Sequence, residues 1–232
     1  MGSGAESPTR MSLLHTDTVD RVLSMTAAEK DDVLAEMETR AEREGFPTVG
    51  PEVGEFLRLC ARLTGADAVF EFGSGYGYSA YWVAPAVGSE GRIVLTEIDA
   101  EELDEAESYF ERGGYADRAV FERGDAIEIV DRYDGPFDLV LLDHENDRYV
   151  EGFEAVRDKV SAGGVVVAEN VLNSGTSMTP GELEAYLRGE ITADEGSTLD
   201  GIETYLSSVR ADPSFETTVL PIGDGVFASV RI

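Results

Sequence analysis

Five short apolar runs alternate with helical stretches through the middle of the chain, and this alternation constrains the fold more than any other feature. The runs are AVFEF (68–72), RIVLTEID (92–99), AVFERGD (119–125), FDLVLLD (137–143) and GVVVAEN (164–170). Helical stretches near 78–87, 100–112, 126–132 and 149–160 separate them. Parallel strands need crossover connections of this kind, and strands buried on both faces are continuously apolar. The sequence therefore predicts an α/β fold, a parallel sheet with helices on both faces.

The C-terminal end departs from this alternation. FETTVLPI (215–222) and VFASVRI (226–232) are strand-like runs joined by Gly-Asp-Gly, a sequence suited to a tight hairpin. We expect this antiparallel pair to complete a mostly parallel, seven-stranded sheet. Further helical patterns cover 16–45, 51–64, 181–189 and 198–210. No linker or composition break divides the chain, so we expect one domain over 16–232, preceded by a flexible leader at 1–15.

Charge restricts the classes of partner. The chain carries 47 Asp and Glu against 18 Lys and Arg, a formal net charge of -29, with the acids spread through every segment. Such a surface repels nucleic acid and anionic membranes, so neither is expected as a partner. Hydrophobic residues still make up 42% of the sequence, enough for an intact core. An even acidic coat around a normal core indicates adaptation to a high-salt cytoplasm, where ions screen the repulsion.

The single cysteine, Cys60, has Leu57, Leu59 and Leu63 as neighbours, which predicts a buried helix position and a reduced, cytoplasmic setting. No apolar run approaches the ~18 residues that a membrane-spanning helix needs.

A glycine-rich segment, EFGSGYGYSA (71–80), follows one predicted strand and opens a predicted helix. Glycines there allow a sharp turn and close approach of a ligand to the backbone. Glu97 ends the next strand, where an acid accepts ribose hydroxyls. A dinucleotide would place its pyrophosphate on this loop, but Glu71 just before it would repel phosphate and attract an ammonium group. The pair of acids therefore favours S-adenosylmethionine.

More polar residues follow the later strands. Asp125, in Gly-Asp-Ala, either faces the adenine edge or caps a helix. Asp143, Glu169 and Asn170 fall at the carboxyl ends of neighbouring strands, where parallel sheets bind ligands. Two carboxylates and an amide suit a hard cation such as Mg²⁺, although acids at strand ends are often only solvated.

Four motifs in order resemble the cation-dependent O-methyltransferase family, which includes the catechol and caffeoyl-CoA enzymes. EFGSGYGYSA is similar to the family's first motif, DHENDRY (143–149) to its metal and base segment, ENVLNSG (169–175) to a second metal segment, and LPIGDG (220–225) to its closing hairpin. The resemblance covers about residues 45–232. It implies a Rossmann-like methyltransferase fold, a homodimer, and methyl transfer to one hydroxyl of a vicinal pair on a small, aromatic acceptor chelated by Mg²⁺.

The resemblance also assigns roles by position. Val49, Glu71, Ser79 and Asp143 would surround the methionine part of the cofactor, and Gly73, Gly75 and Tyr78 would line the loop. Glu97 would hold the ribose, and Asp125, Ala126 and Ile127 would border the adenine. Asp143, Glu169 and Asn170 would be the metal ligands, and Asp143 and Asn146 would occupy the catalytic positions.

The sequence departs from the family at two of these positions. Asn146 stands where the family has a lysine that serves as general base, and an amide cannot hold a proton near neutral pH. Asp147 and His144 are possible substitutes, although Asp147 also suits a helix N-cap and His144 also suits packing against the cofactor. Glu169 replaces an aspartate and is one methylene longer, which shifts a site that depends on octahedral geometry.

Three functions therefore remain open. The first is a metal-assisted O-methyltransferase with a weakened base, which we favour. The second is a homologue that binds the cofactor without methyl transfer. The third, an NAD-dependent oxidoreductase on the same sheet, is disfavoured by Glu71 and the C-terminal hairpin.

Overall fold

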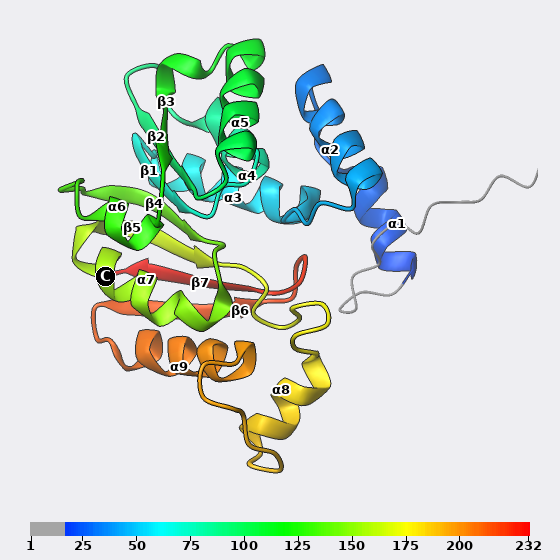
Figure 1. The fold of residues 1–232 in the computed structure, drawn as a ribbon, viewed down its shortest axis with the longest axis vertical. Coiled ribbons are helices and arrows are strands. Elements are labelled where there is room, and N and C mark those ends of the chain that lie inside the picture. Colours follow the sequence, from blue (N-terminus) through cyan, green and yellow to red (C-terminus); the bar gives the residue numbers. More distant parts are fainter. Residues whose placement is uncertain (1–16) are drawn as a thin grey trace, which may run out of the picture.

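The fold, seen in a computed structural model that describes residues 17–232, is built on a seven-stranded sheet (Figure 1). The leader expected at 1–15 lies outside the described residues. The strand order is β3-β2-β1-β4-β5-β7-β6, parallel from β3 to β5 and antiparallel in β7 and β6. The strands are β1 (Ala68–Phe72), β2 (Arg92–Glu97), β3 (Ala119–Arg123), β4 (Phe137–Leu142), β5 (Val160–Ala168), β6 (Phe215–Leu220) and β7 (Val226–Arg231). The expected mostly parallel sheet with a C-terminal antiparallel pair is confirmed.

Helices cover both faces of the sheet. One face carries α2 (Asp32–Glu44), α3 (Gly50–Thr64), α4 (Tyr78–Val83) and α5 (Ala100–Gly113), and the other carries α6 (Ala126–Val130), α7 (Tyr149–Val156) and α9 (Thr198–Ala211). In Figure 1, α1 (Asp17–Thr26) and α8 (Pro180–Leu187) lie at the periphery. Short 3-10 turns are η1 (Ala84–Ala86), η2 (Ala116–Arg118), η3 (Asn146–Arg148) and η4 (Arg157–Lys159). Within residues 17–232, no helix combines the length and apolar character needed to cross a membrane.

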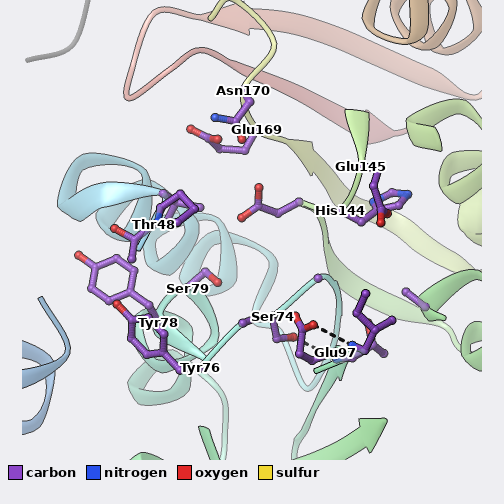
Figure 2. Close-up of a pocket in the computed structure, with 18 of the residues that line it drawn as sticks. Thr48, Ser74, Tyr76, Tyr78, Ser79, Glu97, His144, Glu145, Glu169 and Asn170 are labelled. Carbon is purple, nitrogen blue, oxygen red and sulfur yellow. Dashed lines mark hydrogen bonds between the residues drawn. The ribbon is translucent and has the colours of Figure 1, made fainter. Parts of the chain in front are cut away.

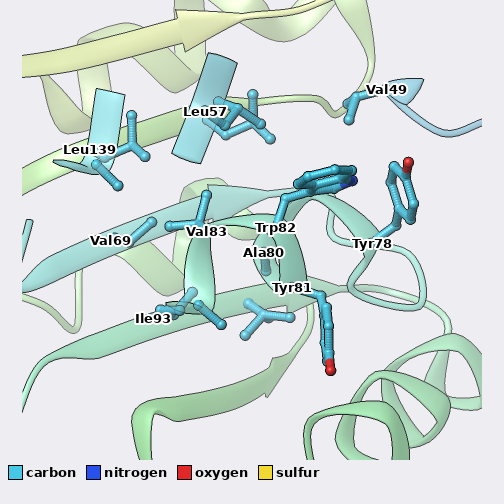
Figure 3. Packing of buried hydrophobic residues seen from close by; sticks show 14 of the residues in the cluster. Val49, Leu57, Val69, Tyr78, Ala80, Tyr81, Trp82, Val83, Ile93 and Leu139 are labelled. Carbon is cyan, nitrogen blue, oxygen red and sulfur yellow. The ribbon is translucent and has the colours of Figure 1, made fainter. Parts of the chain in front are cut away.

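Alternation along β1 divides its side chains between two hydrophobic cores. Val69 packs with α3 and α4, whereas Phe70 and Phe72 pack in the core beneath α6 and α7. Figure 3 shows the first core, in which Trp82 lies beneath α3. Gly54 permits this approach, because a Cβ there would lie 2.3 Å from a Trp82 ring atom. The same alternation turns Glu71 toward the α3 and α4 face, into apolar surroundings.

Several element boundaries differ from expectation. β5 begins at Val160 rather than near 164, and the hairpin turn is a loop over residues 221–225 rather than a tight turn. Cys60 is buried as expected, and burial raises its pKa to about 11, but Leu59 and Leu63 beside it are exposed. Asp147 is not the expected N-cap of a helix, because it lies inside η3 and Arg148 occupies the cap position of α7.

Candidate active site

A cavity of about 670 Å³ opens at the carboxyl ends of the parallel strands, which we call the strand-end cavity (Figure 2). From β1 the chain builds outward to β2 and β3 and then returns to place β4 and β5 on the other side. Ligands bind at such a switch point because the connections on either side diverge. The lining residues are 46–49, 73–76, 78, 79, 96–98, 124–126, 143–145, 148, 169 and 170.

The glycine loop between β1 and α4 forms the floor of this cavity. Gly73, Gly75 and Gly77 all have positive φ angles, 77°, 48° and 82°, which glycine adopts without strain. A Cβ on Gly73 would lie 2.6 Å from the carbonyl oxygen of Asp143. Two features therefore prevent any larger residue at position 73. One is the positive φ angle, and the other is the close approach of the segment that follows β4.

Glu97 is fixed by the loops around it. Its Oε2 accepts a hydrogen bond from the Gly75 N–H at 2.9 Å, and its Oε1 accepts from the N–H groups of Ile98 and Asp99 at 2.8 and 3.0 Å. A carboxylate offers about four lone-pair positions, so Oε2 retains one for a ligand. Glu97 can therefore accept a sugar hydroxyl from a fixed position, but the backbone already occupies Oε1.

Glu71 lies behind the cavity rather than in its lining. The side chain is buried, with 2% exposure, and the Ser79 hydroxyl, which does line the cavity, donates to its Oε1. Burial raises the pKa of Glu71 to about 7, and the nearby hydroxyls of Ser79 and Ser74 offset this only in part. Its Oε2 accepts no hydrogen bond from the described residues. A buried carboxylate with an unsatisfied oxygen is stabilised by a cationic group, so the fit to an ammonium ligand is good.

Asp125 caps a helix, one of the two roles expected for it, and it also lines the cavity. As N-cap of α6 it accepts a hydrogen bond from the Ile127 N–H at 2.9 Å, and Arg148 Nη2 binds its other oxygen at 2.9 Å. Burial opposes ionisation of Asp125, but the Ile127 N–H and the Arg148 guanidinium outweigh it and lower the pKa. Asp125 and Ala126 line the cavity, while Ile127 packs against the second core instead.

Asp143, Glu169 and Asn170 also line the cavity. Figure 2 shows Glu169 and Asn170 together, away from Glu97 and Ser74. Asn170 has a φ of 56°, the only positive value for a non-glycine residue in the described part of the chain. Asn tolerates this conformation better than most residues, and such backbone strain clusters at functional sites.

The donor chemistry of these three side chains suits a hard cation. Two carboxylates and an amide are oxygen ligands of the kind that Mg²⁺ takes, with water completing its shell. Within residues 17–232, no three His, Cys, Asp or Glu side chains converge to form a metal site by themselves. A cation held here would therefore need the Asn170 amide or water beside the two carboxylates.

Asn146 does not reach the cavity. Its Oδ1 accepts a hydrogen bond from the Ser174 hydroxyl at 2.9 Å, and it is absent from the lining. Its turn, η3, packs closely on α9, where a Cβ on Gly201 would lie 2.6 Å from the Asn146 carbonyl oxygen. Of the two residues expected at the catalytic positions, Asp143 therefore lines the cavity and Asn146 does not.

His144 lines the cavity between two aromatic rings. The centroid of its ring lies 5.3 Å from that of Phe72 and 5.2 Å from that of Tyr149. Its Nε2 lies 3.2 Å from the Arg148 carbonyl oxygen. Burial lowers the pKa of His144, so the ring is neutral at neutral pH. A low pKa makes it a weak proton acceptor, and its surroundings are those of a packing residue.

Most of the expected site residues thus meet in one place. Those in the lining are Val49, Gly73, Gly75, Tyr78, Ser79, Glu97, Asp125, Ala126, Asp143, Glu169 and Asn170. Glu71, Ile127 and Asn146 lie outside it. The cavity wall at Phe46, Pro47 and Thr48 was not predicted, although a Pro-containing link between two helices marks it in the sequence. Arg148 was not predicted as a lining residue either, although it lies in the DHENDRY segment.

A family model described as O-methyltransferase matches residues 24–232. A catechol O-methyltransferase from Niastella koreensis is 30% identical over 75% of this chain and 81% of its own. A caffeoyl-CoA O-methyltransferase from Petroselinum crispum is 27% identical over 95% of this chain and 93% of its own.

Solved structures give the same picture of the fold. The O-methyltransferase from Bacillus cereus, in complex with SAH (S-adenosylhomocysteine), has a TM-score of 0.78 and 26% identity over 93% of this chain and 97% of its own. The O-methyltransferase TomG from Streptomyces achromogenes, in complex with SAM (S-adenosylmethionine), has a TM-score of 0.79 over 92% and 96% of the two chains. At 24% identity, this second likeness supports the fold alone.

Proposed function

The chain belongs to the O-methyltransferase family, and on that premise we propose that it transfers a methyl group from S-adenosylmethionine to a hydroxyl of a small aromatic acceptor, assisted by a divalent cation. The homologous Bacillus cereus enzyme carries the demethylated cofactor in its structure. The acceptor is inferred to be a vicinal diol, since two adjacent hydroxyls chelate a cation.

The observation that carries the proposal is the half-satisfied, buried carboxylate of Glu71 beneath the glycine loop. A dinucleotide would bring a pyrophosphate to this loop and meet that acid. Among the described residues that line the cavity, Arg148 is the only lysine or arginine, and it is already paired with Asp125 and Glu151. The site therefore favours a ligand with an ammonium group and no phosphate, which argues against NAD.

The cofactor would span the cavity from Glu71 to Asp125. Glu71, through Ser79, and Val49 would hold the methionine end, Glu97 would accept a ribose hydroxyl, and Asp125 and Ala126 would border the adenine. When bound, the cofactor supplies a methyl group on an electrophilic sulfonium. Asp143 also lines the cavity, and it is assigned both to the methionine end of the cofactor and to the cation, so the two substrates would meet beside it.

Asp143, Glu169 and Asn170 would hold the divalent cation. The bound cation would supply a lowered pKa for a coordinated hydroxyl. By holding the cation, the three side chains would position the acceptor hydroxyl within the same cavity as the cofactor. Holding two reactants in line accounts for a large share of a rate enhancement without any covalent intermediate.

No lysine serves as general base in this proposal. Asn146 bonds to Ser174 and its amide does not take up a proton, so the proton of the hydroxyl must pass to a lining carboxylate or to solvent. General-base catalysis typically contributes ~10²–10⁴-fold, so its loss slows the transfer without abolishing it. The same observation favours the second candidate, a homologue that binds the cofactor without methyl transfer.

A turnover assay separates the two candidates. The protein is incubated in molar KCl with methyl-labelled S-adenosylmethionine, Mg²⁺ and a panel of dihydroxy-aromatic compounds. We expect labelled product, and a loss of rate when a chelator removes the cation. Glu169→Gln keeps the side-chain shape but removes a charged ligand, so it should lower turnover by at least ~10-fold while S-adenosylhomocysteine binding changes less than about twofold. Absence of product with every acceptor, alongside normal cofactor binding, would support the second candidate.

A further inference from the structure

Three tyrosines attach α2 to the glycine loop and to α4. The Tyr76 hydroxyl donates to the Met37 carbonyl oxygen at 3.1 Å, and the Tyr78 hydroxyl donates to Glu38 at 2.8 Å. The Tyr81 hydroxyl donates to Asp31, the N-cap of α2, at 2.9 Å. Helix α2 is therefore a cover over the segment that forms the cavity floor.

Arg40, on the inner side of α2, contacts this tyrosine layer directly. Its guanidinium carbon lies 4.4 Å from the centroid of the Tyr76 ring and 6.0 Å from that of Phe46. The residue is buried, with 9% exposure. A desolvated guanidinium over an aromatic face is a favourable cation–π contact, and its planar shape stacks in a way that a lysine ammonium does not.

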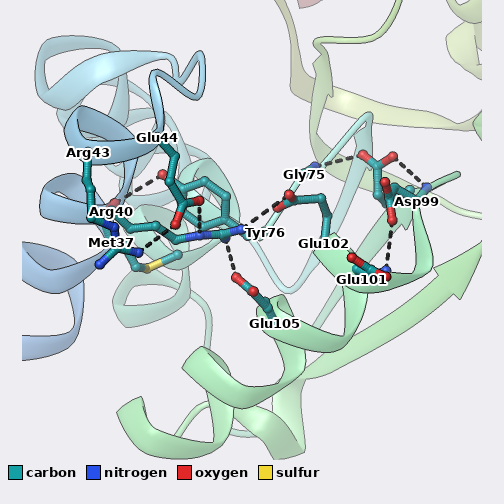
Figure 4. A network of polar contacts seen from close by, with 11 residues as sticks. Met37, Arg40, Arg43, Glu44, Gly75, Tyr76, Asp99, Glu101, Glu102 and Glu105 are labelled. Atoms are coloured by element: carbon teal, nitrogen blue, oxygen red, sulfur yellow. Dashed lines mark hydrogen bonds and ion pairs between the residues drawn. The ribbon is translucent and has the colours of Figure 1, made fainter.

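Carboxylates from two helices surround the same guanidinium (Figure 4). Arg40 Nε binds Glu44 of α2 at 2.9 Å, Nη2 binds Glu102 of α5 at 3.2 Å, and Nη1 binds Glu105 of α5. Removing the cation would leave three acids facing one another between α2 and α5. In a protein of net charge -29 that repulsion would push α2 away from α5.

The contact extends from Tyr76 to the cavity wall. Phe46 packs edge-on against Tyr76 with ring centroids 4.9 Å apart, and both residues line the cavity. Phe46 lies so close to the glycine loop that a Cβ on Gly75 would come within 2.9 Å of its ring. A displacement of α2 would therefore move Phe46 and the following wall residues Pro47 and Thr48.

We propose that Arg40 is a positioning residue for cofactor binding, which seats α2 on Tyr76 and α5 and so fixes the Phe46 wall of the cavity. The inference rests on the proposed function, because it takes the ligand of the cavity to be S-adenosylmethionine. Arg40 does not line the cavity and acts through Tyr76 and Phe46.

The test compares Arg40→Met, Arg40→Lys and the control Arg112→Met. Arg112 also joins α5 to α2, through Glu36, but it is exposed and its ring contact is with Tyr109 rather than Tyr76. Binding of S-adenosylhomocysteine is measured by calorimetry in molar KCl, and KM for S-adenosylmethionine and kcat are measured by methyl transfer. Circular dichroism and thermal unfolding establish that each variant folds.

We expect Arg40→Met to raise the Kd and this KM about tenfold with kcat changed less than about twofold, because the wall rather than the reacting groups is displaced. Arg40→Lys retains the charge but loses the stacking and should give an intermediate Kd. Arg112→Met should bind within about twofold of the wild type. If Arg40→Met does not fold, the Kd of Arg40→Lys alone tests the inference, and a value equal to that of the wild type would overturn it.

Wild-type affinity for S-adenosylhomocysteine in the Arg40 variants would overturn the inference. An equal loss of affinity in Arg112→Met would also overturn it, because any ion pair between α2 and α5 would then have the same effect. Both results leave the proposed function intact. A wild-type protein that does not bind S-adenosylhomocysteine at all would instead refute the proposed function, and this inference with it.

Discussion

At the scale of single residues, Glu71 is the group whose chemistry depends most on its surroundings. In water a glutamate is ionised at neutral pH, but here burial raises its pKa to about 7. The carboxylate is therefore partly protonated in the range where the protein would bind its cofactor. An ammonium group bound on the other side of Ser79 would favour the ionised form of Glu71.

This predicts a pH-dependent affinity. Binding of S-adenosylmethionine should strengthen by about tenfold between pH 6 and pH 8, because ionisation of Glu71 near pH 7 creates the charge that attracts the ammonium group. Glu71→Gln should abolish most of this dependence and weaken binding at pH 8 by a similar factor. Calorimetric titrations at a series of pH values measure both effects.

The stability of the unliganded protein should change with pH in the opposite direction to the affinity. The pKa of Glu71 in the folded state lies above its ordinary value of 4.5, so its contribution to stability is present below that pH and is lost as pH rises through about 7. Glu71→Gln should therefore stabilise the unliganded protein at pH 8. Glu216→Gln, at an exposed position of β6, is the control and should change neither affinity nor stability. An unaltered pH profile in Glu71→Gln would remove Glu71 from the cofactor site.

At the scale of elements, the strands were predictable because strands that are buried on both faces consist mostly of apolar residues. β4, FDLVLL, is apolar at every position except Asp138, and helices cover both of its faces. The start of β5 carries no such signal, since Ala162 and Gly163 are exposed, and the sequence therefore placed that strand too late. Helix α4 ends early at Val83, and the chain continues as a 3-10 turn that contains Pro85.

The site was predictable where it depends on strand ends and less so where it depends on distant contacts. Glu97 and Asp143 could be placed because they terminate predicted strands, and the carboxyl ends of parallel strands meet at one edge. The direction of Asn146 depends on Gly201, far away in the sequence, whose missing side chain lets α9 approach η3. No local pattern carries that information.

At the scale of the whole molecule, charge is the dominant feature. Many of the basic side chains are used in ion pairs, such as Arg132 with Glu122 and Arg157 with Asp212, yet the acids outnumber them by more than two to one. Unpaired acids cover the outer faces of the helices, as in α5, where Glu101, Asp104 and Glu107 are exposed. We propose that the fold is adapted to concentrated salt.

This adaptation predicts a stability that rises with ionic strength. The thermal unfolding midpoint should increase by at least ~5 °C between 0.1 and 2 M KCl, because the screening length falls from ~10 Å to ~3 Å or less and the repulsion among acids weakens. Scanning calorimetry measures the midpoint, and sucrose, which stabilises without screening charge, is the control. A midpoint that does not depend on KCl would contradict the proposal.

The proposed function requires the strand-end cavity to bind the sulfonium cofactor, with acids at its amino and sugar ends. Two calorimetric titrations of the wild-type protein in molar KCl, one with S-adenosylmethionine and one with NAD, are the sharpest test. We expect saturable one-to-one binding of S-adenosylmethionine and no measurable heat with NAD. Saturation by NAD, with no binding of S-adenosylmethionine, would contradict it.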